Sequence, residues 1–237
     1  MGLYDNYNFD GLKLFSEIKK TPSISEPCLP FLSAIEFLSA MKKLKTISLP
    51  RNIIVAEIGI GVGATTLSAL KMLDSDDVYY AFDFDYRVKA LEEDLKVIAR
   101  DFGIKCQVVT KGNSNKRFDS YNWNLSNMIF EMRKKNEVGI FDAVYLDGAH
   151  TLLHDGLAVC LLKELIKDGG FLILDDLFWS YNVSPRMQKA GLEYFPEEQV
   201  KDHQIFRVQE LFLSNDPNFE RLSSPKDSRG IFRKHSH

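Results

Sequence analysis

Apolar and polar positions follow a strand–helix rhythm between residues 52 and 174. Short β-branched and apolar runs predict five buried strands, and apolar residues at helical spacing between them predict amphipathic helices. Before this region, helical spacing from 31 to 45 predicts one more helix, and residues 1–30 predict an irregular arm with a short helix at 10–19. The predicted strands of the rhythm are 52–58, 78–84, 104–110, 141–146 and 171–174, and its predicted helices are 63–73, 86–102, 123–135 and 152–167.

The rhythm breaks after residue 176. Residues 177–203 predict a helix within a longer loop, and 205–213 and 230–234 predict two closing strands that form an antiparallel hairpin. Alternating strands and helices specify a parallel sheet covered by helices on both faces. The pattern therefore predicts an α/β fold whose mostly parallel, seven-stranded sheet ends in an antiparallel pair. This plan resembles the Rossmann-like fold of the class I methyltransferases, which use S-adenosylmethionine (SAM).

The pattern predicts two parts along the chain. Residues 1–48 are predicted to form an N-terminal arm and cap helix, and residues 49–237 a SAM-dependent methyltransferase domain, in which 177–203 is a candidate substrate lid. The arm and its helix are also candidates for a homodimer contact.

Composition narrows the class of protein. The chain has 237 residues, of which 45% are hydrophobic, and a formal net charge of −3. No basic run is long enough to indicate a nucleic-acid partner, and no apolar run reaches the roughly 18 residues of a membrane span. The three cysteines form no CxxC pair, so neither a disulfide framework nor a zinc site is expected. We expect a cytoplasmic protein with no membrane partner.

The strongest local motif follows the strand at 52–58 and opens a helix. It has the form Glu-x-Gly-x-Gly-x-Gly, and glycines let the backbone pass close to a ligand at a helix N-terminus. A carboxylate before the first glycine would repel a pyrophosphate, but it can accept hydrogen bonds from the ammonium group of SAM. A threonine hydroxyl in the first helical turn can hold the methionine carboxylate. The predicted cofactor residues of this turn are Glu57, Gly59, Gly61, Gly63 and Thr65.

Two further positions are predicted to contact the nucleoside part of the cofactor. An acid at the end of the second strand of the rhythm is where a ribose diol would be held. Asp83 and Asp85 share a face of that strand, and we prefer Asp83 because it immediately follows the apolar run. The loop that contains Asn113 follows the third strand, where an adenine edge would be read, although a plain turn explains this loop equally well.

Three carboxylates follow the next two strands. Asp147 ends the strand at 141–146, and Asp175 and Asp176 end the strand at 171–174. The carboxyl ends of parallel strands meet at one edge of a sheet, where ligands bind. Carboxylates crowded together repel one another, and a divalent cation relieves this repulsion. Oxygen ligands suit Mg²⁺, with Mn²⁺ also possible.

Residues 50–180 resemble the metal-dependent small-molecule O-methyltransferases of the catechol type and, more closely, of the macrolide-sugar and cephalosporin-tailoring type. In that group an Asp at the end of the fourth strand, and an acidic residue followed by Asp or Asn at the end of the fifth, bind the metal, which implies Asp147, Asp175 and Asp176 here. Asp147 is also counted among the cofactor-binding residues. The group places a Lys or His base three residues after the first Asp, which implies His150. The aromatic residues Phe178, Trp179 and Tyr181 follow the acidic pair and are candidates for a wall of the acceptor pocket.

The implied reaction is metal-assisted transfer of a methyl group from SAM to a hydroxyl of a small molecule. A metal would lower the pKa of the hydroxyl, and His150 would accept its proton. A metal-independent N-methyltransferase and a non-catalytic SAM-binding protein remain open alternatives. The spacing before Gly59 counts against a nicotinamide-dependent oxidoreductase. The sequence does not identify the acceptor.

Overall fold

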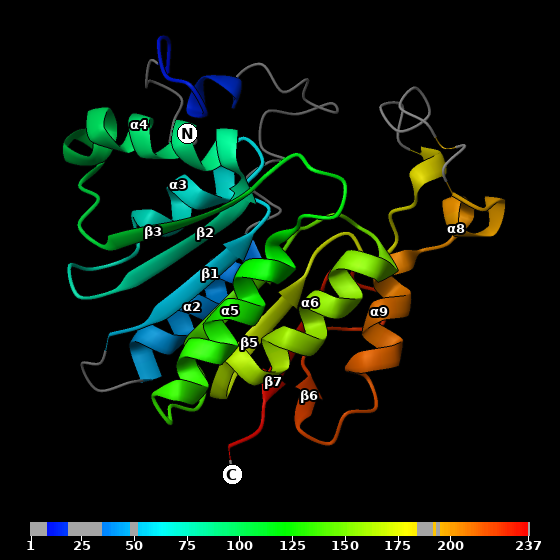
Figure 1. Cartoon of the computed structure of the whole chain (residues 1–237). Coiled ribbons are helices and arrows are strands. Elements are labelled where there is room, and N and C mark those ends of the chain that lie inside the picture. Colours follow the sequence, from blue (N-terminus) through cyan, green and yellow to red (C-terminus); the bar gives the residue numbers. More distant parts are fainter. Residues whose placement is uncertain (1–8, 19–34, 48–51, 184–191, 193–194, 237) are drawn as a thin grey trace. The chain divides into compact units, whose positions relative to one another are not determined.

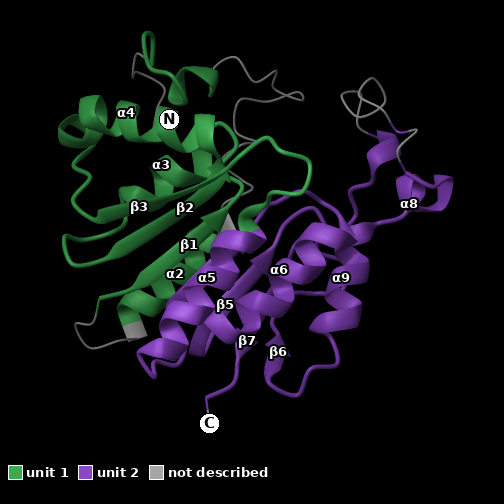
Figure 2. Ribbon diagram, viewed as in Figure 1, with its two compact units in different colours: residues 1–121 green, residues 122–237 purple. Residues whose placement is uncertain are grey.

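The structure is a computed structural model that describes residues 9–18, 35–47, 52–183, 192 and 195–236 (Figure 1). The chain divides into two compact units (Figure 2). Unit 1 consists of residues 1–121, and unit 2 of residues 122–237.

Unit 1 contains three parallel strands flanked by helices. Its elements are η1 (Phe15–Glu17), α2 (Ile35–Ile47), β1 (Ile54–Ile58), α3 (Ala64–Leu70), β2 (Val78–Phe84), α4 (Asp85–Phe102) and β3 (Gln107–Asn113). Strand β2 lies between the other two, since Val78 pairs with Ile54 on one side and with Gln107 on the other. Four of the five residues of β1 are buried, as expected for a strand covered on both faces.

Helix α4 shows how local sequence fixes an element of unit 1. Its buried residues Val88, Leu91 and Ile98 recur at helical spacing and therefore form one apolar face. Gly103 ends the helix in the left-handed region, with φ of 64°, and its N–H bonds to the carbonyls of the last turn. Glycine is favoured there because it lacks the Cβ that makes this conformation costly.

Unit 2 continues the parallel arrangement and adds the antiparallel end. Its elements are α5 (Tyr121–Lys134), β4 (Phe141–Leu146), α6 (Leu152–Leu165), β5 (Ile166–Leu174), η2 (Tyr181–Val183), α8 (Glu197–Lys201), α9 (Gln204–Phe212), β6 (Phe219–Arg221) and β7 (Gly230–Lys234). Strands β4 and β5 are parallel, whereas β7 is antiparallel to both β5 and β6. Every residue of β4 is buried.

The sheet has seven strands in the order β3-β2-β1-β4-β5-β7-β6. This confirms the predicted α/β class, with a mostly parallel sheet and an antiparallel C-terminal pair. The predicted division into residues 1–48 and 49–237 stays a prediction. None of the helices in the described ranges is long and apolar enough to cross a membrane.

One predicted strand is wrong. Residues 205–213, expected as a closing strand, form helix α9, and the antiparallel partner of β7 is instead the short strand β6. The physical reason is the spacing of the buried residues of α9. The buried residues are Gln204, Ile205, Val208 and Gln209. This spacing places them on one face of a helix, whereas the residues on one face of a strand would be two apart.

Other boundaries differ by smaller amounts. The helix expected at 10–19 is only the single turn η1, and β5 begins at Ile166, five residues before the prediction. The loop at 177–203 contains the short elements η2 and α8, and its residues 184–191 and 193–194 lie outside the described ranges.

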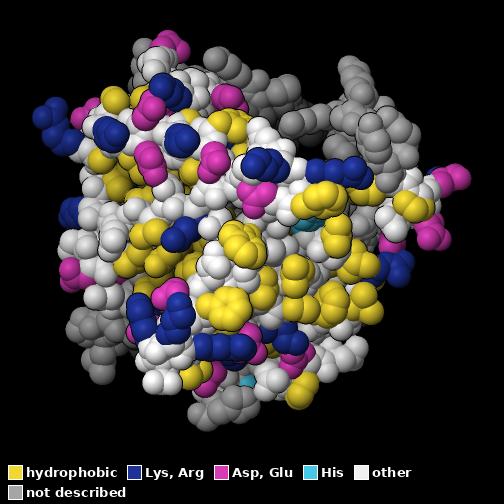
Figure 3. Space-filling view, viewed as in Figure 1, with side chains coloured by type: hydrophobic (Ala, Val, Ile, Leu, Met, Phe, Trp, Pro, Cys, Tyr) yellow, Lys and Arg dark blue, Asp and Glu magenta, His cyan; other side chains and the backbone are white. Residues whose placement is uncertain are grey.

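The outer surfaces of α6 and α9 expose several large apolar side chains. Leu153 on α6 is 76% exposed and Leu211 on α9 is 61% exposed. Figure 3 shows hydrophobic side chains gathered over these two helices. The expected homodimer stays a prediction.

Candidate functional site

The glycine turn of unit 1 has a backbone that favours glycine. Gly59, Gly61 and Gly63 adopt φ values of 90°, 52° and 82°, all in the left-handed region. Residues other than glycine, asparagine and aspartate rarely adopt this region. Within the turn Gly61 is exposed, whereas Gly63, the N-cap residue of α3, is buried.

Glu57 anchors this turn from below. It is 1% exposed, and its Oε2 accepts hydrogen bonds from the hydroxyls of Thr66 (2.6 Å) and Tyr79. Burial raises the pKa of Glu57 to about 7, whereas the two hydroxyl donors act in the opposite direction. The carboxyl group therefore joins β1, β2 and α3. A contact between Glu57 and the ammonium group of SAM stays a prediction.

The raised pKa of Glu57 makes stability depend on pH, and we expect Glu57→Gln to reduce this dependence. The folded-state pKa of about 7 exceeds the ordinary value of 4.5 for a glutamate, so the folded chain binds this proton more tightly than the unfolded chain. The associated stabilisation is fully present below pH 4.5 and is lost as the pH rises through about 7. The loss is of the order of 3 kcal/mol.

Urea unfolding at pH 5 and pH 8 measures this difference. The fall in unfolding free energy between the two pH values should be smaller in Glu57→Gln than in the unaltered chain. Glu92→Gln, at an exposed position of α4, is the matched control and should behave as the unaltered chain. Equal falls in the Glu57 variant and the unaltered chain would show that Glu57 is already ionised when buried.

The predicted ribose acid is joined to the glycine turn. The Oδ2 atom of Asp83 accepts hydrogen bonds from the backbone N–H groups of Ile60 (2.9 Å) and Gly61 (3.1 Å). Burial raises the pKa of Asp83, opposed by these donors and by Arg87. Asp85 is instead exposed, as the first residue of α4. Which of the two acids contacts a ribose stays a prediction.

The other two predicted cofactor residues of unit 1 are also buried. Thr65 lies in the first turn of α3 and is 7% exposed, and Asn113 ends β3 and is 6% exposed. Their contacts with a cofactor stay predictions.

Unit 2 brings an aspartate–histidine–aspartate cluster together. Ligand atoms of Asp147, His150 and Asp176 all lie within 4.8 Å of one another. The Nε2 atom of His150 is 3.5 Å from Asp147 Oδ1 and 3.7 Å from Asp176 Oδ2. These residues follow β4 and β5, at the carboxyl ends of parallel strands, as predicted.

Two members of this cluster have an unusual backbone. His150 has φ of 55° and Asp176 has φ of 54°. In the described residues only one other non-glycine residue, Asn136, has a positive φ. A left-handed conformation at such a residue costs of the order of 1 kcal/mol, and such residues concentrate at functional sites. The backbone conformation that directs these two side chains toward each other therefore lowers the free energy of unfolding.

Asp175 takes a different position from the one expected of a metal ligand. It is 5% exposed, and its Oδ2 accepts a hydrogen bond from the hydroxyl of Tyr145. Its Oδ1 lies 2.8 Å from Arg229 Nε and accepts the backbone N–H of Asp176 (2.9 Å). Asp175 thus contacts the cluster through the backbone of Asp176. Its predicted role as a metal ligand stays a prediction.

Opposing effects act on the pKa of Asp176. Burial raises the pKa of Asp176, the neighbouring charge of Asp175 raises it further, and His150 and Arg229 lower it. A cation at the cluster would oppose the first two effects, because it stabilises the ionised carboxylate.

Aromatic residues stand beside the cluster, as the sequence suggested. The ring of Trp179 is 4.9 Å from that of His150 and 4.9 Å from that of Tyr181. The Tyr181 hydroxyl donates to the carbonyl of Ala149 (3.0 Å), next to His150 in the chain. Phe178 is 41% exposed and stacks on Phe206. The aromatic group therefore both holds the loop of His150 and offers an exposed ring.

Comparison with known proteins shows which solved structures share the fold of this chain. No family model matches the chain, and no curated protein matches it. Among solved structures, the methyltransferase PaMTH1 of Podospora anserina, bound to S-adenosylhomocysteine (SAH), is 14% identical with a TM-score of 0.54. The match covers 94% of this chain and 86% of that chain. The O-methyltransferase TomG of Streptomyces achromogenes, in complex with SAM, is 11% identical with a TM-score of 0.54, over 97% of this chain and 92% of that chain.

A third solved structure is the MycE methyltransferase of the mycinamycin biosynthetic pathway, in complex with Mg and SAH. It is 17% identical with a TM-score of 0.55, over 94% of this chain and 55% of that chain. The chain has the class I methyltransferase fold. At these identities the likeness concerns the fold alone, and the activity must be argued from the residues.

Within this methyltransferase fold, Arg87, Tyr145 and Arg229 are among the contributing residues that were not predicted from the sequence. Arg87 lies four residues after Asp83, but Asp83 belongs to β2 and Arg87 to α4, so the pairing rule for residues of one helix gave no signal. Tyr145 lies on β4, two residues before Asp147, which directly follows that strand, so period-2 alternation indicated it. Arg229 gave no signal, because its approach to Asp175 depends on the return of the chain into β7.

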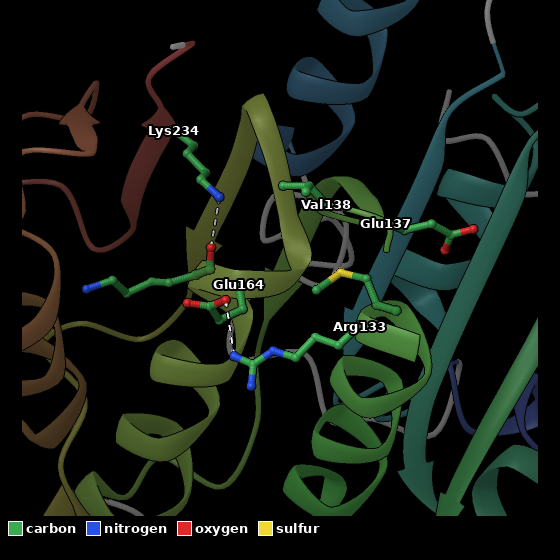
Figure 4. A pocket seen from close by; sticks show the side chains of 7 residues that line it. Arg133, Glu137, Val138, Glu164 and Lys234 are labelled. Carbon is green, nitrogen blue, oxygen red and sulfur yellow. Dashed lines mark hydrogen bonds and ion pairs between the residues drawn. The ribbon is translucent and has the colours of Figure 1, made fainter. Parts of the chain in front are cut away.

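A separate cavity in the methyltransferase fold lies away from this chemistry. It has a volume of about 240 Å³ and is lined by the end of α5, the segment before β4 and the end of α6 (Figure 4). Val138 at its wall precedes β4, whereas Asp147 follows that strand. Two of its charged residues have partners within the lining: Arg133 lies 3.5 Å from Glu164, and Lys234 donates to the carbonyl of Lys163. The cavity is therefore not part of the candidate site.

Proposed function

We propose that this chain is a SAM-dependent methyltransferase that methylates a hydroxyl group of a small molecule with the help of a divalent cation. The observation that carries the proposal is the cluster of Asp147, His150 and Asp176, in which His150 and Asp176 have a left-handed backbone conformation. In the same chain, unit 1 presents a glycine turn joined to a buried acid. The solved structures of similar fold include methyltransferases bound to SAM or SAH.

The donor set of the cluster fits a divalent cation. The carboxylate oxygens of Asp147 and Asp176 lie close enough to share an ion after small movements of the side chains, and the imidazole of His150 lies beside them. Carboxylates suit Mg²⁺ and Mn²⁺. Asp147 and Asp176 would hold the ion in this proposal. The ion would lower the pKa of the acceptor hydroxyl and orient it.

The residues of the chain supply the remaining steps. His150 accepts the hydroxyl proton at Nε2, and the hydroxyl oxygen forms a bond to the methyl carbon of SAM. The bond between that carbon and the SAM sulfur breaks, and SAH is the product. Glu57, Asp83 and the glycine turn hold the cofactor so that it is correctly oriented for attack. Trp179 and Phe178 exclude water and contact the acceptor.

Calorimetry with two ligands tests the proposal. SAH should bind the unaltered chain saturably, and Mn²⁺ should then bind the SAH-saturated chain. Asp176→Asn should weaken Mn²⁺ binding about tenfold or more, because it removes a charged ligand. Asp175→Asn should weaken it by no more than about threefold, because Arg229 and Tyr145 already engage that carboxylate.

Each result has a distinct meaning. Absence of SAH binding would contradict the methyltransferase proposal as a whole. SAH binding without Mn²⁺ binding would contradict the metal-assisted step and favour a metal-independent N-methyltransferase. A larger loss in Asp175→Asn than in Asp176→Asn would make Asp175 a metal ligand, as the sequence resemblance implies.

A further inference from the structure

A short segment of the N-terminal arm packs tightly onto unit 1. We name residues 9–18 the clasp. Phe9, Leu14 and Phe15 are 1%, 2% and 0% exposed, although they belong to a segment with only one helical turn. The ring of Phe9 stacks on that of Phe102 at the end of α4, with 6.2 Å between centroids. Figure 1 shows the clasp beside α4.

A buried carboxylate holds the clasp. Asp94 on α4 is 2% exposed and accepts hydrogen bonds from three consecutive backbone N–H groups. These belong to Lys13 (2.7 Å), Leu14 (2.7 Å) and Phe15 (3.0 Å). Hydrogen bonds to an ionised carboxylate are among the strong ones. The pairing spans about 80 residues of sequence, so it fixes the clasp to α4 and not to its own neighbours.

The clasp touches the glycine turn directly. A Cβ atom built at Gly63 would lie 2.5 Å from Phe15 Cε1 and 3.0 Å from Leu14 Cδ2. Even a methyl group at Gly63 would therefore meet the clasp. Since Gly63 opens α3 at the turn proposed to hold SAM, the Phe15 ring lies against the backbone of that turn.

Arg87 makes a second connection between the clasp and the turn. Its Nη1 donates to the carbonyl of Gly61 and lies 3.8 Å from Glu17 Oε2. Its Nε lies 3.9 Å from Asp83 Oδ1. One guanidinium group thus connects the end of the clasp, the glycine turn and the predicted ribose acid.

We propose that the clasp closes over the cofactor turn and slows release of the cofactor, and that Asp94 is its positioning residue. The inference rests on the proposed binding of SAM by unit 1. A cofactor held at the turn then leaves only when the contacts of Phe15 and Asp94 loosen. Because Asp94 contacts the backbone of the clasp, it acts through the clasp and not on the cofactor.

The dissociation rate of radiolabelled SAH, chased with excess unlabelled SAH, tests the inference. Asp94→Ala should raise this rate at least tenfold, which corresponds to about 1.4 kcal/mol, with the association rate within about threefold. Hydrogen exchange of the amides of Lys13, Leu14 and Phe15 should accelerate in the same variant. Asp94→Asn, which keeps one acceptor oxygen, should be intermediate.

Two further variants keep the test decisive. Phe15→Ala removes the ring over Gly63 but keeps the backbone bonds to Asp94, so it should speed SAH release while the three amides stay protected. Asp101→Ala changes an exposed acid at the end of α4 and should leave both readouts unchanged. This control separates the role of Asp94 from a general effect of charge on α4.

The outcomes separate the clasp from the proposed function. If Asp94→Ala exposes the three amides but SAH release is unchanged, the clasp is only a structural support and the inference is wrong. The same conclusion follows if Phe15→Ala releases SAH at the original rate. If the unaltered chain binds no SAH at all, the proposed function fails first, and the inference fails with it.

Discussion

Replacing His150 with alanine is expected to lower the rate of methyl transfer about 100-fold or more, with SAH affinity unchanged within about twofold. His150 and its two aspartate neighbours all belong to unit 2, whereas the residues proposed to hold the cofactor belong mainly to unit 1. Initial rates with labelled SAM and a hydroxyl acceptor found by screening measure the first quantity, and calorimetry with SAH measures the second.

His154→Ala is the matched control for this substitution. His154 lies one helical turn later, and its Nδ1 is 2.8 Å from Thr151 Oγ1 in the N-cap of α6. We expect its rate to stay within about threefold. If SAH affinity falls as much as the rate in the His150 variant, the role of His150 is structural. If Mn²⁺ binding is lost instead, His150 is a metal ligand and not the base.

Asp83→Asn is expected to weaken SAH binding about 30- to 100-fold. An ionised carboxylate that accepts hydrogen bonds from a ribose diol contributes about 2–3 kcal/mol, and the amide replaces one of its acceptors with a donor. The same substitution also removes the charge that engages the N–H groups of Ile60 and Gly61. Calorimetry gives the affinity, and thermal unfolding of the ligand-free chain shows how much of the loss is structural.

Asp85→Asn tests the preference for Asp83 over Asp85 as the ribose acid. Asp85 is exposed at the start of α4 and shares a strand face with Asp83. We expect its SAH affinity to change by less than about threefold. A large loss at Asp85 with little change at Asp83 would reverse the assignment. It would also mean that Asp83 serves only to fix the glycine turn.

The fold was predictable where local patterns and long-range packing agree. Strand β2 lies exactly at the predicted 78–84, and β4 at 141–146, because each is an apolar run bounded by polar residues. Helix α9 was not predicted, although the buried Ile205 and Val208 have helical spacing. The partner strand β6 has only three residues, too few to show any period.

The candidate site was predictable in its residue types but not in all its contacts. Strand ends identified Asp147 and Asp176, and the resemblance supplied His150, which the structure places within the same cluster. The adjacent Asp175 could not be separated from Asp176 by sequence, because its difference comes from Arg229, more than fifty residues away. The clasp was equally hidden, since its hold depends on Asp94 in a distant helix.

The left-handed backbone at His150 and Asp176 sets selection for heat tolerance against selection for turnover. Glycine would relieve the conformational cost at either position, so a screen for thermostable variants alone would enrich replacements there. Those variants would keep the fold and lose the side chains that do the chemistry. In a laboratory evolution experiment these two positions should therefore be held fixed, and stability should be sought elsewhere in the chain.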